Sequence, residues 1–480
     1  MKKIFLLLLI TSFVGVIIFI SCKKDPLCEG CINGNRPPIA NAGPDQVITL
    51  PTDSISLDGS ASHDPDGTIN IFIWKKISGP VSGSLGIAIT SRTNAKNLVE
   101  GNYQFELKVT DDRGLIAKDT INVIVIKPPT ITITCPPANR PLINAQLISI
   151  GNLSVGRYYM AAVSAGNKLF FAGGKAPGSG NLSSRVDIYD ISSQSWSTSE
   201  LSMPRWHLSA VAAGDKVFFA GGSSTGVTSR VDIYNLTTNT WTIAELSQAR
   251  DGIETATLGN KVFFAGGFSG VSRSSRVDIY DLSTNAWSIA NLSEAKTGFT
   301  ATAVGNKIYF AGGVTNSGPT SNKIDIYDNM TDSWSTSTLN TGKGFHAAIF
   351  QSGKIYWAGG ATHIDYQGGI GNEDLITCDL EIKDVNTQIS SFANLSNPKY
   401  FNGAFEKENK IVFISLYGGW QYWQDFDIYD TGSDSWSIGL LPQAISSYAS
   451  IISVNNVIYV AGGINPGNTG YSNQVLKLEF

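Results

Sequence analysis

The sequence predicts an all-β protein, in which a seven-bladed β-propeller follows a smaller immunoglobulin-like β-sandwich. Three features predict this class. The chain has 49 glycines in 480 residues and only 15% charged residues, a composition typical of short strands joined by turns. In the first part, polar and apolar residues alternate as in half-buried strands. In the second part, a pair of glycines recurs at nearly constant intervals, which indicates a repeat architecture.

The composition also excludes several classes of protein. With 42% hydrophobic and 10% aromatic residues, the chain can bury a core and is not disordered. The net charge of -4 and the lack of a long basic block argue against nucleic acid as a partner. We expect a monomer.

Residues 1–21 predict a lipoprotein signal peptide. Lys2 and Lys3 precede an apolar run over residues 4–20, which ends at Ser21 and Cys22. This ending resembles the lipobox of bacterial lipoproteins of the Bacteroidetes type. The resemblance implies acylation of Cys22, a membrane anchor, and a location in the cell envelope that faces the periplasm or the cell surface. The alternative is an uncleaved signal anchor.

Residues 22–36 are predicted to form a tether. Cys28 and Cys31 lie in it as a C-x-x-C pair, which favours a local disulfide or an inert pair. A redox motif would need a helix start, and zinc would need two further ligands nearby. Cys135 falls in a later linker, and Cys378 in a segment with the pattern of a strand.

Residues 37–127 have the pattern of six or seven short strands in a sandwich. Turn clusters at 65–67 and 111–114 separate the runs. The residues expected to face the core are Tyr103, Phe105, Leu107 and Val109 in one run, and Ile69, Ile71 and Ile73 in another.

The segments 40–45, 57–67 and 109–111 of this region resemble a PKD domain. PKD domains usually act as spacers or adhesive modules, and some relatives bind calcium. The resemblance makes Asp64, Asp66 and Asp111 candidate calcium ligands, because carboxylate oxygens suit that ion. The alternative is that these residues only form the turns. No other cofactor is expected.

Residues 128–145 are rich in proline and are predicted to be a linker, and residues 146–480 hold the repeat. The first glycines of successive pairs are 44 to 48 residues apart, except for one interval of 59. Most pairs are followed by Val-Asp-Ile-Tyr or a variant and then by a tryptophan, such as Trp196 or Trp241. The glycine pair, the tyrosine and the tryptophan resemble the kelch repeat, which implies blades of four strands. The last unit ends after its third strand, so strand 147–154 is expected to complete the seventh blade.

The loop into the first strand of each blade provides the candidate ligand site. Six of the seven loops have a basic residue at one position: Arg157, Arg205, Arg250, Lys296, Lys343 and Lys399. In kelch domains that bind acidic peptides, arginines at this position line the pocket, which implies an anionic ligand at the channel mouth. The alternative is that they pair locally with carboxylates such as Asp251 or Glu294. The further candidates are loop aromatics and histidines: Trp206, His207, His346, Trp420 and Trp423.

Three functions follow, in order of preference. The first is a binding module for a glycan or protein ligand at the propeller mouth. The second is a structural or adhesion protein in which the sandwich makes the contact. The third is a carbohydrate mutarotase or epimerase with His207 or His346 as acid or base beside Arg205. No sequence motif of an enzyme active site stands out, so an enzyme is the less favoured expectation.

Overall fold

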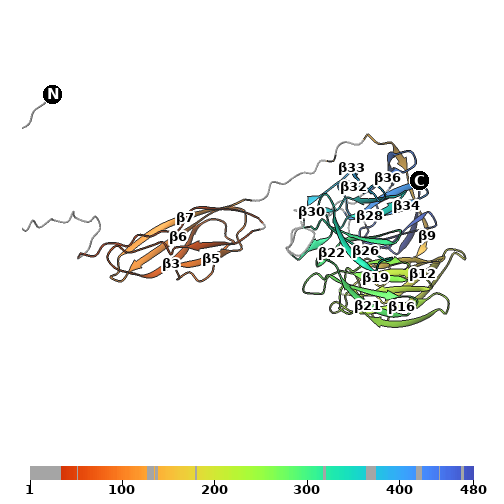
Figure 1. The fold of residues 1–480 in the computed structure, drawn as a ribbon, viewed down its shortest axis with the longest axis horizontal. Helices are drawn as coiled ribbons and strands as arrows, with labels where there is room; N and C mark the ends of the chain where they lie inside the picture. The colour runs from red at the N-terminus through yellow and green to blue at the C-terminus, as the bar shows by residue number, and fades with distance from the viewer. Residues whose placement is uncertain are drawn as a thin grey trace, which may run out of the picture. The chain divides into compact units, whose positions relative to one another are not determined.

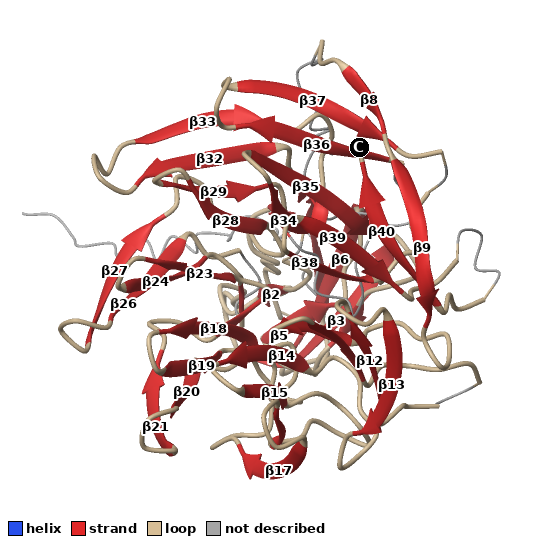
Figure 2. Ribbon diagram, turned by 90° about the vertical axis from the view of Figure 1, so that its right-hand side faces the viewer, coloured by secondary structure: helices blue, strands red, loops and turns tan. Residues whose placement is uncertain are grey.

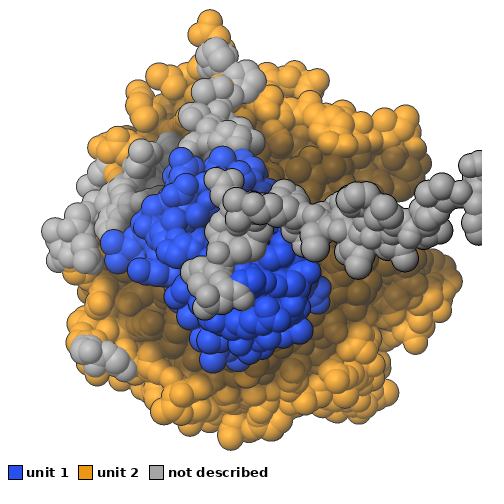
Figure 3. Space-filling view, turned by 90° about the vertical axis from the view of Figure 1, so that its left-hand side faces the viewer, with its two compact units in different colours: residues 1–130 blue, residues 131–480 orange. Residues whose placement is uncertain are grey.

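The computed structural model describes residues 34–50, 52–126, 135, 139–178, 181–316, 320–363, 375–417, 424–442, 444–465 and 470–480. The chain divides into two compact units, Met1–Thr130 and Ile131–Phe480, which Figure 3 shows in blue and orange. Figure 1 shows the ribbon coloured by residue number. Every regular element within the described ranges is a β-strand. No helix in these ranges is long and apolar enough to cross a membrane. The signal peptide, Cys22, Cys28 and Cys31 lie outside the described residues.

The first unit is a two-sheet sandwich. Its larger sheet has the order β1-β7-β6-β3 and its smaller sheet the order β2-β5-β4. The strands are β1 (Gln46–Thr49), β2 (Ile55–Asp58), β3 (Ile69–Ser78), β4 (Ser84–Leu85), β5 (Arg92–Lys96), β6 (Gly101–Asp111) and β7 (Ile116–Ile126).

The sandwich core confirms one predicted strand pattern and corrects the other. On β6, Tyr103, Phe105, Leu107 and Val109 are all buried, as their alternation predicts. On β3, Ile71 and Ile73 face solvent and Trp74 is buried instead. An irregularity in the pairing with β6 lies between Ile69 and Ile71. Because one extra residue exchanges the two faces of a strand, the three isoleucines cannot share one face.

The second unit is a propeller of seven blades (Figure 2). In blades one to six, four antiparallel strands follow in chain order from the centre outward, and in blade seven β9 takes the fourth place. Blades one to three are β10 (Ala161–Ala165), β11 (Lys168–Ala172), β12 (Arg185–Asp190), β13 (Ser195–Glu200); β14 (Ser209–Ala213), β15 (Lys216–Ala220), β16 (Arg230–Asn235), β17 (Thr240–Glu245); and β18 (Glu254–Leu258), β19 (Lys261–Ala265), β20 (Arg276–Asp281), β21 (Ala286–Asn291).

Blades four to seven follow the same plan. They are β23 (Thr300–Val304), β24 (Lys307–Ala311), β26 (Lys323–Asp328), β27 (Ser333–Thr338); β28 (Ala347–Gln351), β29 (Lys354–Ala358), β32 (Asp379–Asp384), β33 (Ser390–Asn394); β34 (Tyr400–Lys407), β35 (Lys410–Tyr417), β36 (Asp425–Asp430), β37 (Ser435–Leu440); and β38 (Ser450–Val454), β39 (Val457–Ala461), β40 (Gln474–Glu479) with β9 (Gln146–Asn152). Short ribbons β22 (Lys296–Thr297) with β25 (Val314–Thr315), and β30 (Ala361–His363) with β31 (Leu375–Ile376), lie in the loops.

The ring is closed by the segment that precedes the first blade. Strand β9 pairs antiparallel with β40, so the fourth strand of blade seven comes from the N-terminal side of the propeller. The innermost strands contact one another in sequence, and β38 contacts β10. Strand β8 (Leu142–Asn144) also pairs parallel with β37 and widens blade six to five strands. Strand β9 gives blade seven the four strands of the other blades and ties the N-terminal side of the propeller to its last blade.

The repeated residues have structural roles that explain their spacing. Tyr234 and Trp241, with ring centroids 5.0 Å apart, belong to the cluster that packs blade one against blade two. In each glycine pair that the structure describes, both residues have positive φ, for example 68° and 96° at Gly173 and Gly174. A side chain at Gly173 would meet the Arg205 carbonyl oxygen at 2.5 Å. The pair therefore lets the next blade's loop approach the backbone closely.

Candidate ligand-binding site at the propeller mouth

The six basic residues expected at the channel mouth are buried inside the blades. The exposed fraction is 0% for Arg157, Arg205, Arg250, Lys296 and Lys399 and 1% for Lys343. A soluble ligand cannot reach side chains that are this deeply enclosed. The prediction of a basic, solvent-facing ring is therefore wrong.

These side chains form ion pairs with the aspartate of the Val-Asp-Ile-Tyr strand in their own blade. Arg205 Nη2 lies 2.6 Å from Asp232, and Lys296 Nζ lies 2.8 Å from Asp325. Lys399 contacts Asp427 at 2.7 Å. The same pairing joins Arg157 to Asp187 and Arg250 to Asp278. The sequence analysis did not predict these aspartates as partners, although each one is the second residue of a Val-Asp-Ile-Tyr segment or of a close variant.

Backbone carbonyls complete each ion pair. Arg157 Nη1 donates to the carbonyls of Gly173 and Arg185 at 2.8 and 2.7 Å. The other oxygen of Asp187 accepts from the backbone N–H of Ser154 at 2.9 Å. Burial lowers the pKa of Arg157 to about 10, and the Asp187 carboxylate opposes this shift. The guanidinium therefore stays charged at neutral pH and ties the incoming loop to the third strand.

Two blades depart from this arrangement. In blade five, Glu381 replaces the aspartate and accepts from the Asn340 backbone N–H at 2.9 Å, while Lys343 Nζ donates to the Asp379 carbonyl at 3.4 Å. In blade seven, the basic position is occupied by Ser446, four residues before β38, and the aspartate position by Leu476. Blade seven thus has neither member of the pair.

In the described loops of blades one to five and seven, the mouth is formed by the residues two positions after the basic residue or, in blade seven, after Ser446. At these positions the backbone turns into the left-handed region: φ is 54° at Tyr159, 57° at His207, 52° at Phe345 and 57° at Tyr448. The equivalent positions in blades three and four are Gly252 and Gly298, with φ of 55° and 62°. Left-handed backbone is rare for aromatic residues and is concentrated at functional sites.

The aromatic rings gather on one side of the mouth. The Tyr159 ring centroid lies 4.6 Å from Tyr448, 5.3 Å from Trp206 and 5.1 Å from His207. Trp206 stacks on His207 at 4.9 Å, and Lys175 Nζ lies 3.6 Å above the Trp206 ring. We call these four rings the aromatic rim. It joins blades one, two and seven and offers ring faces to a ligand.

The charges at the mouth come from few groups. Desolvation by the surrounding loops, and secondarily the charge of Lys175, lowers the pKa of His207 below its usual range, although part of the residue is exposed. Desolvation raises the pKa of Asp251, next to Gly252, to about 6. At neutral pH the rim is therefore an uncharged aromatic surface bordered by one ammonium and one carboxylate.

Below the mouth, the channel contains a cavity of about 390 Å³ lined by the first strands of blades three to six. Glu254, Thr300 and His346 line it, and His346 Nε2 lies 3.0 Å from Thr300 Oγ1. Desolvation raises the pKa of Glu254 to about 8, opposed by the backbone N–H of Ala301. Burial, with Lys343 and Lys296, lowers the pKa of His346 to about 3. The cavity therefore holds a neutral imidazole and a carboxyl group that titrates near neutrality.

The remaining predicted site residues have mixed outcomes. Trp206 and His207 lie in the aromatic rim, and His346 lies in the channel cavity. Trp420 and Trp423 fall outside the described residues. Glu254 was not singled out from the sequence, because only the ring of first strands shows that it faces the channel.

Two of the three expected calcium ligands accept hydrogen bonds from other loops of the sandwich, whereas Asp64 Oδ2 is buried without a hydrogen-bond partner among the described residues. Asp111 accepts hydrogen bonds from Asn35 Nδ2 at 2.8 Å and from the Leu115 backbone at 2.8 Å. Asp66 accepts from the Arg36 backbone and from Arg113. In the described part of the chain, no three acidic, histidine or cysteine side chains form a group that could hold a metal ion. Calcium binding by Asp64, Asp66 and Asp111 stays a prediction.

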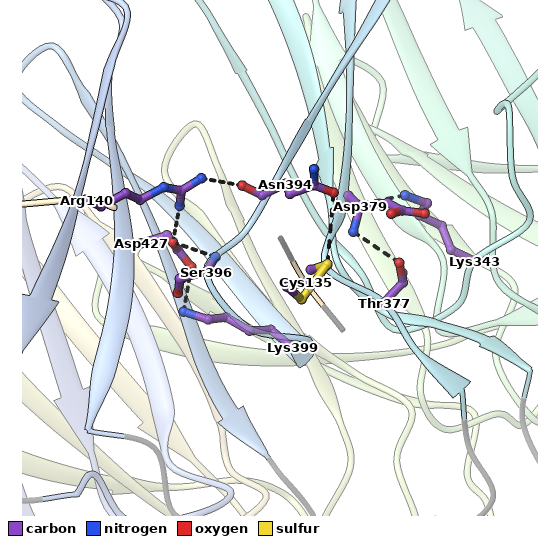
Figure 4. Close-up of a disulfide and its surroundings, with 10 residues drawn as sticks. Cys135, Arg140, Lys343, Thr377, Asp379, Asn394, Ser396, Lys399 and Asp427 are labelled. Atoms are coloured by element: carbon purple, nitrogen blue, oxygen red, sulfur yellow. Dashed lines mark hydrogen bonds and ion pairs between the residues drawn. A yellow bond between two sulfur atoms is a disulfide. The ribbon is translucent and has the colours of Figure 1, made fainter. Parts of the chain in front are cut away.

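A disulfide that was not predicted joins the linker to blade five. Cys135 and Cys378 are bonded across 243 residues of sequence (Figure 4). Nearby, Arg140 forms an ion pair with Asp427, and Asp427 also pairs with Lys399. The Arg140 guanidinium lies 4.2 Å from the centroid of the Trp436 ring. Spacing could not reveal a pair so distant in sequence. We call residues 135–152 the N-terminal arm.

These features define the chain as a kelch-repeat β-propeller preceded by a PKD-like domain. Residues 42–125 match a PKD domain family. Residues 145–297 match the KLHDC2/KLHL20/DRC7 Kelch-repeats domain, and residues 295–337 match the Kelch motif. This pairing of domains supports an interaction module.

The curated relatives match only a small part of their own length. The mouse dyslexia-associated protein KIAA0319-like protein is 42% identical over 91 residues, which is 19% of this chain and 9% of the relative. Human low-density lipoprotein receptor-related protein 11 is 36% identical over 93 residues, 19% of this chain and 18% of the relative. Among solved structures, that of YjhT covers 68% of this chain and 97% of its own, with a TM-score of 0.43 and 16% identity.

Proposed function

We propose that the protein is a lipid-anchored binding module of the bacterial cell envelope, which holds a glycan or a protein segment at the propeller mouth. The aromatic rim is the observation that supports this function. Buried ion pairs hold the loops of Tyr159, Trp206 and His207, so the faces of these three rings are preorganised. An uncharged aromatic surface suits the faces of sugar rings or apolar side chains.

The envelope location rests on two independent features. Residues 1–22 have the order expected of a lipoprotein signal, from Lys2 and Lys3 to Cys22. The Cys135–Cys378 disulfide is the kind of bond that persists in an oxidising compartment. Labelling with a radioactive fatty acid tests the anchor: the wild-type protein should incorporate label, and Cys22→Ser should not. Equal labelling of both proteins would rule the anchor out.

Glycan or peptide binding is tested with the soluble chain from Lys23 onward. Neutral and anionic polysaccharides and a peptide library should be screened at low and high salt. We expect binding that changes little with salt and falls at least about tenfold in Trp206→Ala, because stacking and apolar contact are weakly screened. Arg230→Ala, which changes a partly exposed residue on β16 that is not one of the rim residues, is the matched control. Equal binding by all three proteins would overturn the mouth as the site.

A second function, sugar mutarotation or epimerisation, is favoured by the channel cavity. Glu254 has a pKa of about 8 and shares the cavity with a neutral His346, which supplies an acid and a base for proton transfer. Arg205 cannot assist, because Asp232 neutralises it inside the blade. Anomer exchange on a panel of sugars should be followed by NMR in wild type and Glu254→Gln. Exchange at the uncatalysed rate in the wild type would dismiss this function.

A further inference from the structure

Blade seven contains a cavity where the other blades have an ion pair. Its volume is about 430 Å³, within the range of small-ligand pockets. Its walls include Ser446 and Leu476, which replace the basic residue and the aspartate, together with Gly462 and Gln474. Replacing an arginine and an aspartate with serine and leucine leaves space that the repeat normally fills.

The blade backbone at this cavity keeps the geometry of the regular blades. Gly462 N–H donates to the Gln474 carbonyl at 3.0 Å, just as Gly173 N–H donates to the Arg185 carbonyl at 3.0 Å. Ser447 bridges to Ile464 as Tyr158 bridges to Lys175. The register therefore makes Gly462 and Gln474 the counterparts of Gly173 and Arg185.

Those counterparts identify hydrogen-bond acceptors for a ligand. In blade one, the carbonyls of Gly173 and Arg185 accept hydrogen bonds from the Arg157 guanidinium at 2.8 and 2.7 Å. Blade three repeats this with Arg250, Gly266 and Arg276 at 2.6 and 2.7 Å. Ser446 is too short to supply these donors in blade seven. A bound molecule with hydroxyl groups could supply them instead.

The side chains around the cavity select against charge. Leu476 takes the place of the carboxylate that balances a cation in the other blades, and no charged side chain of the described residues lines the cavity. A buried ion without a partner is costly, so a cationic or anionic ligand is disfavoured. Gln424, Asn465 and Ser472 add neutral donors and acceptors, and Ile445 and Leu147 add apolar surface. Neutral amides, hydroxyls and apolar patches together suit a sugar.

We propose that the blade-seven cavity binds a small neutral polyhydroxylated ligand, such as a single sugar residue, whose hydroxyl groups take the place of the missing guanidinium. This site is separate from the aromatic rim and does not depend on the function proposed there. A sugar at this position would occupy the junction between blades six and seven, close to the strand that closes the ring.

The test restores the ion pair. Methyl glycosides of glucose, galactose, mannose and N-acetylglucosamine should be titrated into the soluble chain from Lys23 onward and followed by calorimetry and ligand-observed NMR. At least one should bind saturably to the wild type. In Ser446→Arg/Leu476→Asp, the pair of the regular blades fills the cavity, and the affinity should fall at least about tenfold.

Further variants distinguish this site from the mouth. Ser446→Phe fills the cavity with a single change and serves if the double variant does not fold; it should weaken binding to a similar extent. Trp206→Ala, in the aromatic rim, should leave the glycoside affinity unchanged. The proposal is overturned if no glycoside binds the wild type, if the filled variants bind as the wild type does, or if guanidinium or methyl glucuronide binds more tightly than every neutral glycoside.

Discussion

Blades one to four and blades five to seven are held in the ring by different means. In the first group, each incoming loop is joined to its blade by a buried basic residue and an aspartate. In the second group the pairing is less regular: blade six keeps Lys399 with Asp427, Lys343 of blade five donates to the Asp379 carbonyl instead, and blade seven has neither member. The N-terminal arm contacts these same three blades, through the Cys135–Cys378 disulfide, Arg140 with β8, and β9.

The difference shows how a repeat tolerates variation. A blade with the complete pattern is fastened by local contacts that come with the repeat. Blades five and seven lack the regular pair, and the arm contacts both of them, as well as blade six, which keeps its pair. The sequences of blades five to seven can therefore vary more than those of blades one to four. The long insertion of blade five and the cavity of blade seven both occur in this group.

The largest expected effect is the loss of one aspartate from the regular half. Asp232→Ala would leave the fully buried Arg205 without its counter-charge, which should lower the free energy of unfolding by about 3–5 kcal/mol. Urea denaturation followed by tryptophan fluorescence would measure this. The control is Glu245→Ala, which breaks the exposed pair with Arg230 and should cost less than about 1 kcal/mol. Equal losses would show that burial of the pair is unimportant.

The next largest effect concerns blades five to seven, which the N-terminal arm contacts. Removing the disulfide with Cys135→Ala and Cys378→Ala should cost about 2–4 kcal/mol, because the bond closes a loop of 243 residues and restricts the unfolded chain. The wild-type protein under reducing conditions should show the same loss. Limited proteolysis should then cut the N-terminal arm before it cuts blades one to four. If the arm stays protected, β8 and β9 alone hold it.

The fold was predictable because its determinants are local and repeated. Gly173 with Gly174 and Tyr234 with Trp241 recur in one order, so the blade period and the strand order could be predicted. The period-two pattern of Tyr103 to Val109 likewise identifies the inner face of β6. Ile71 and Ile73 misled the same argument, because a single irregular residue in β3 reverses the faces and leaves no mark in the composition.

The site was predictable only in part. The sequence identified the positions of Arg157 and its equivalents and placed them near the mouth, but it could not show that their side chains turn inward. That orientation depends on Asp187, which lies 30 residues away and meets Arg157 only through the register of the third strand. Trp206 and His207 lie in the mouth because they are the two residues between the buried Arg205 and Leu208. The Cys135–Cys378 disulfide could not be predicted, because only the closed ring brings these two distant cysteines together.

A smaller effect would test whether the ion pair itself is needed. Replacing both partners, as in Arg205→Met/Asp232→Leu, should cost about 1 kcal/mol or less, because well-packed apolar groups can substitute for a buried pair. The double variant would then be far more stable than Asp232→Ala alone, again by urea denaturation. A loss as large as that of the single variant would mean that the carbonyl acceptors of Phe219 and Arg230 need the guanidinium.

The smallest expected effect is a dependence of stability on pH that comes from Glu254 in the channel cavity and not from the buried ion pairs. The pKa of Glu254 is raised to about 8 in the folded protein, against an ordinary value of 4.5. The folded state therefore binds a proton that the unfolded state has released, and stability falls as pH rises from 4.5 until it levels off above 8. Between pH 7.5 and 8.5 the histidines His207 and His346 are mostly neutral in both states, because their folded pKa values are lowered and their ordinary value of 6.5 lies a full unit below this window, so they add little to the slope.

Within that window the slope should stay below about 1.4 kcal/mol per pH unit, the value for one fully released proton. Glu254→Gln should remove it, whereas Asp232→Ala should lower the whole curve without changing its slope there. Melting temperatures measured every half pH unit would distinguish the two. A slope that persists in Glu254→Gln would assign the titration to another group and would leave the channel cavity without the proton donor that its chemistry requires.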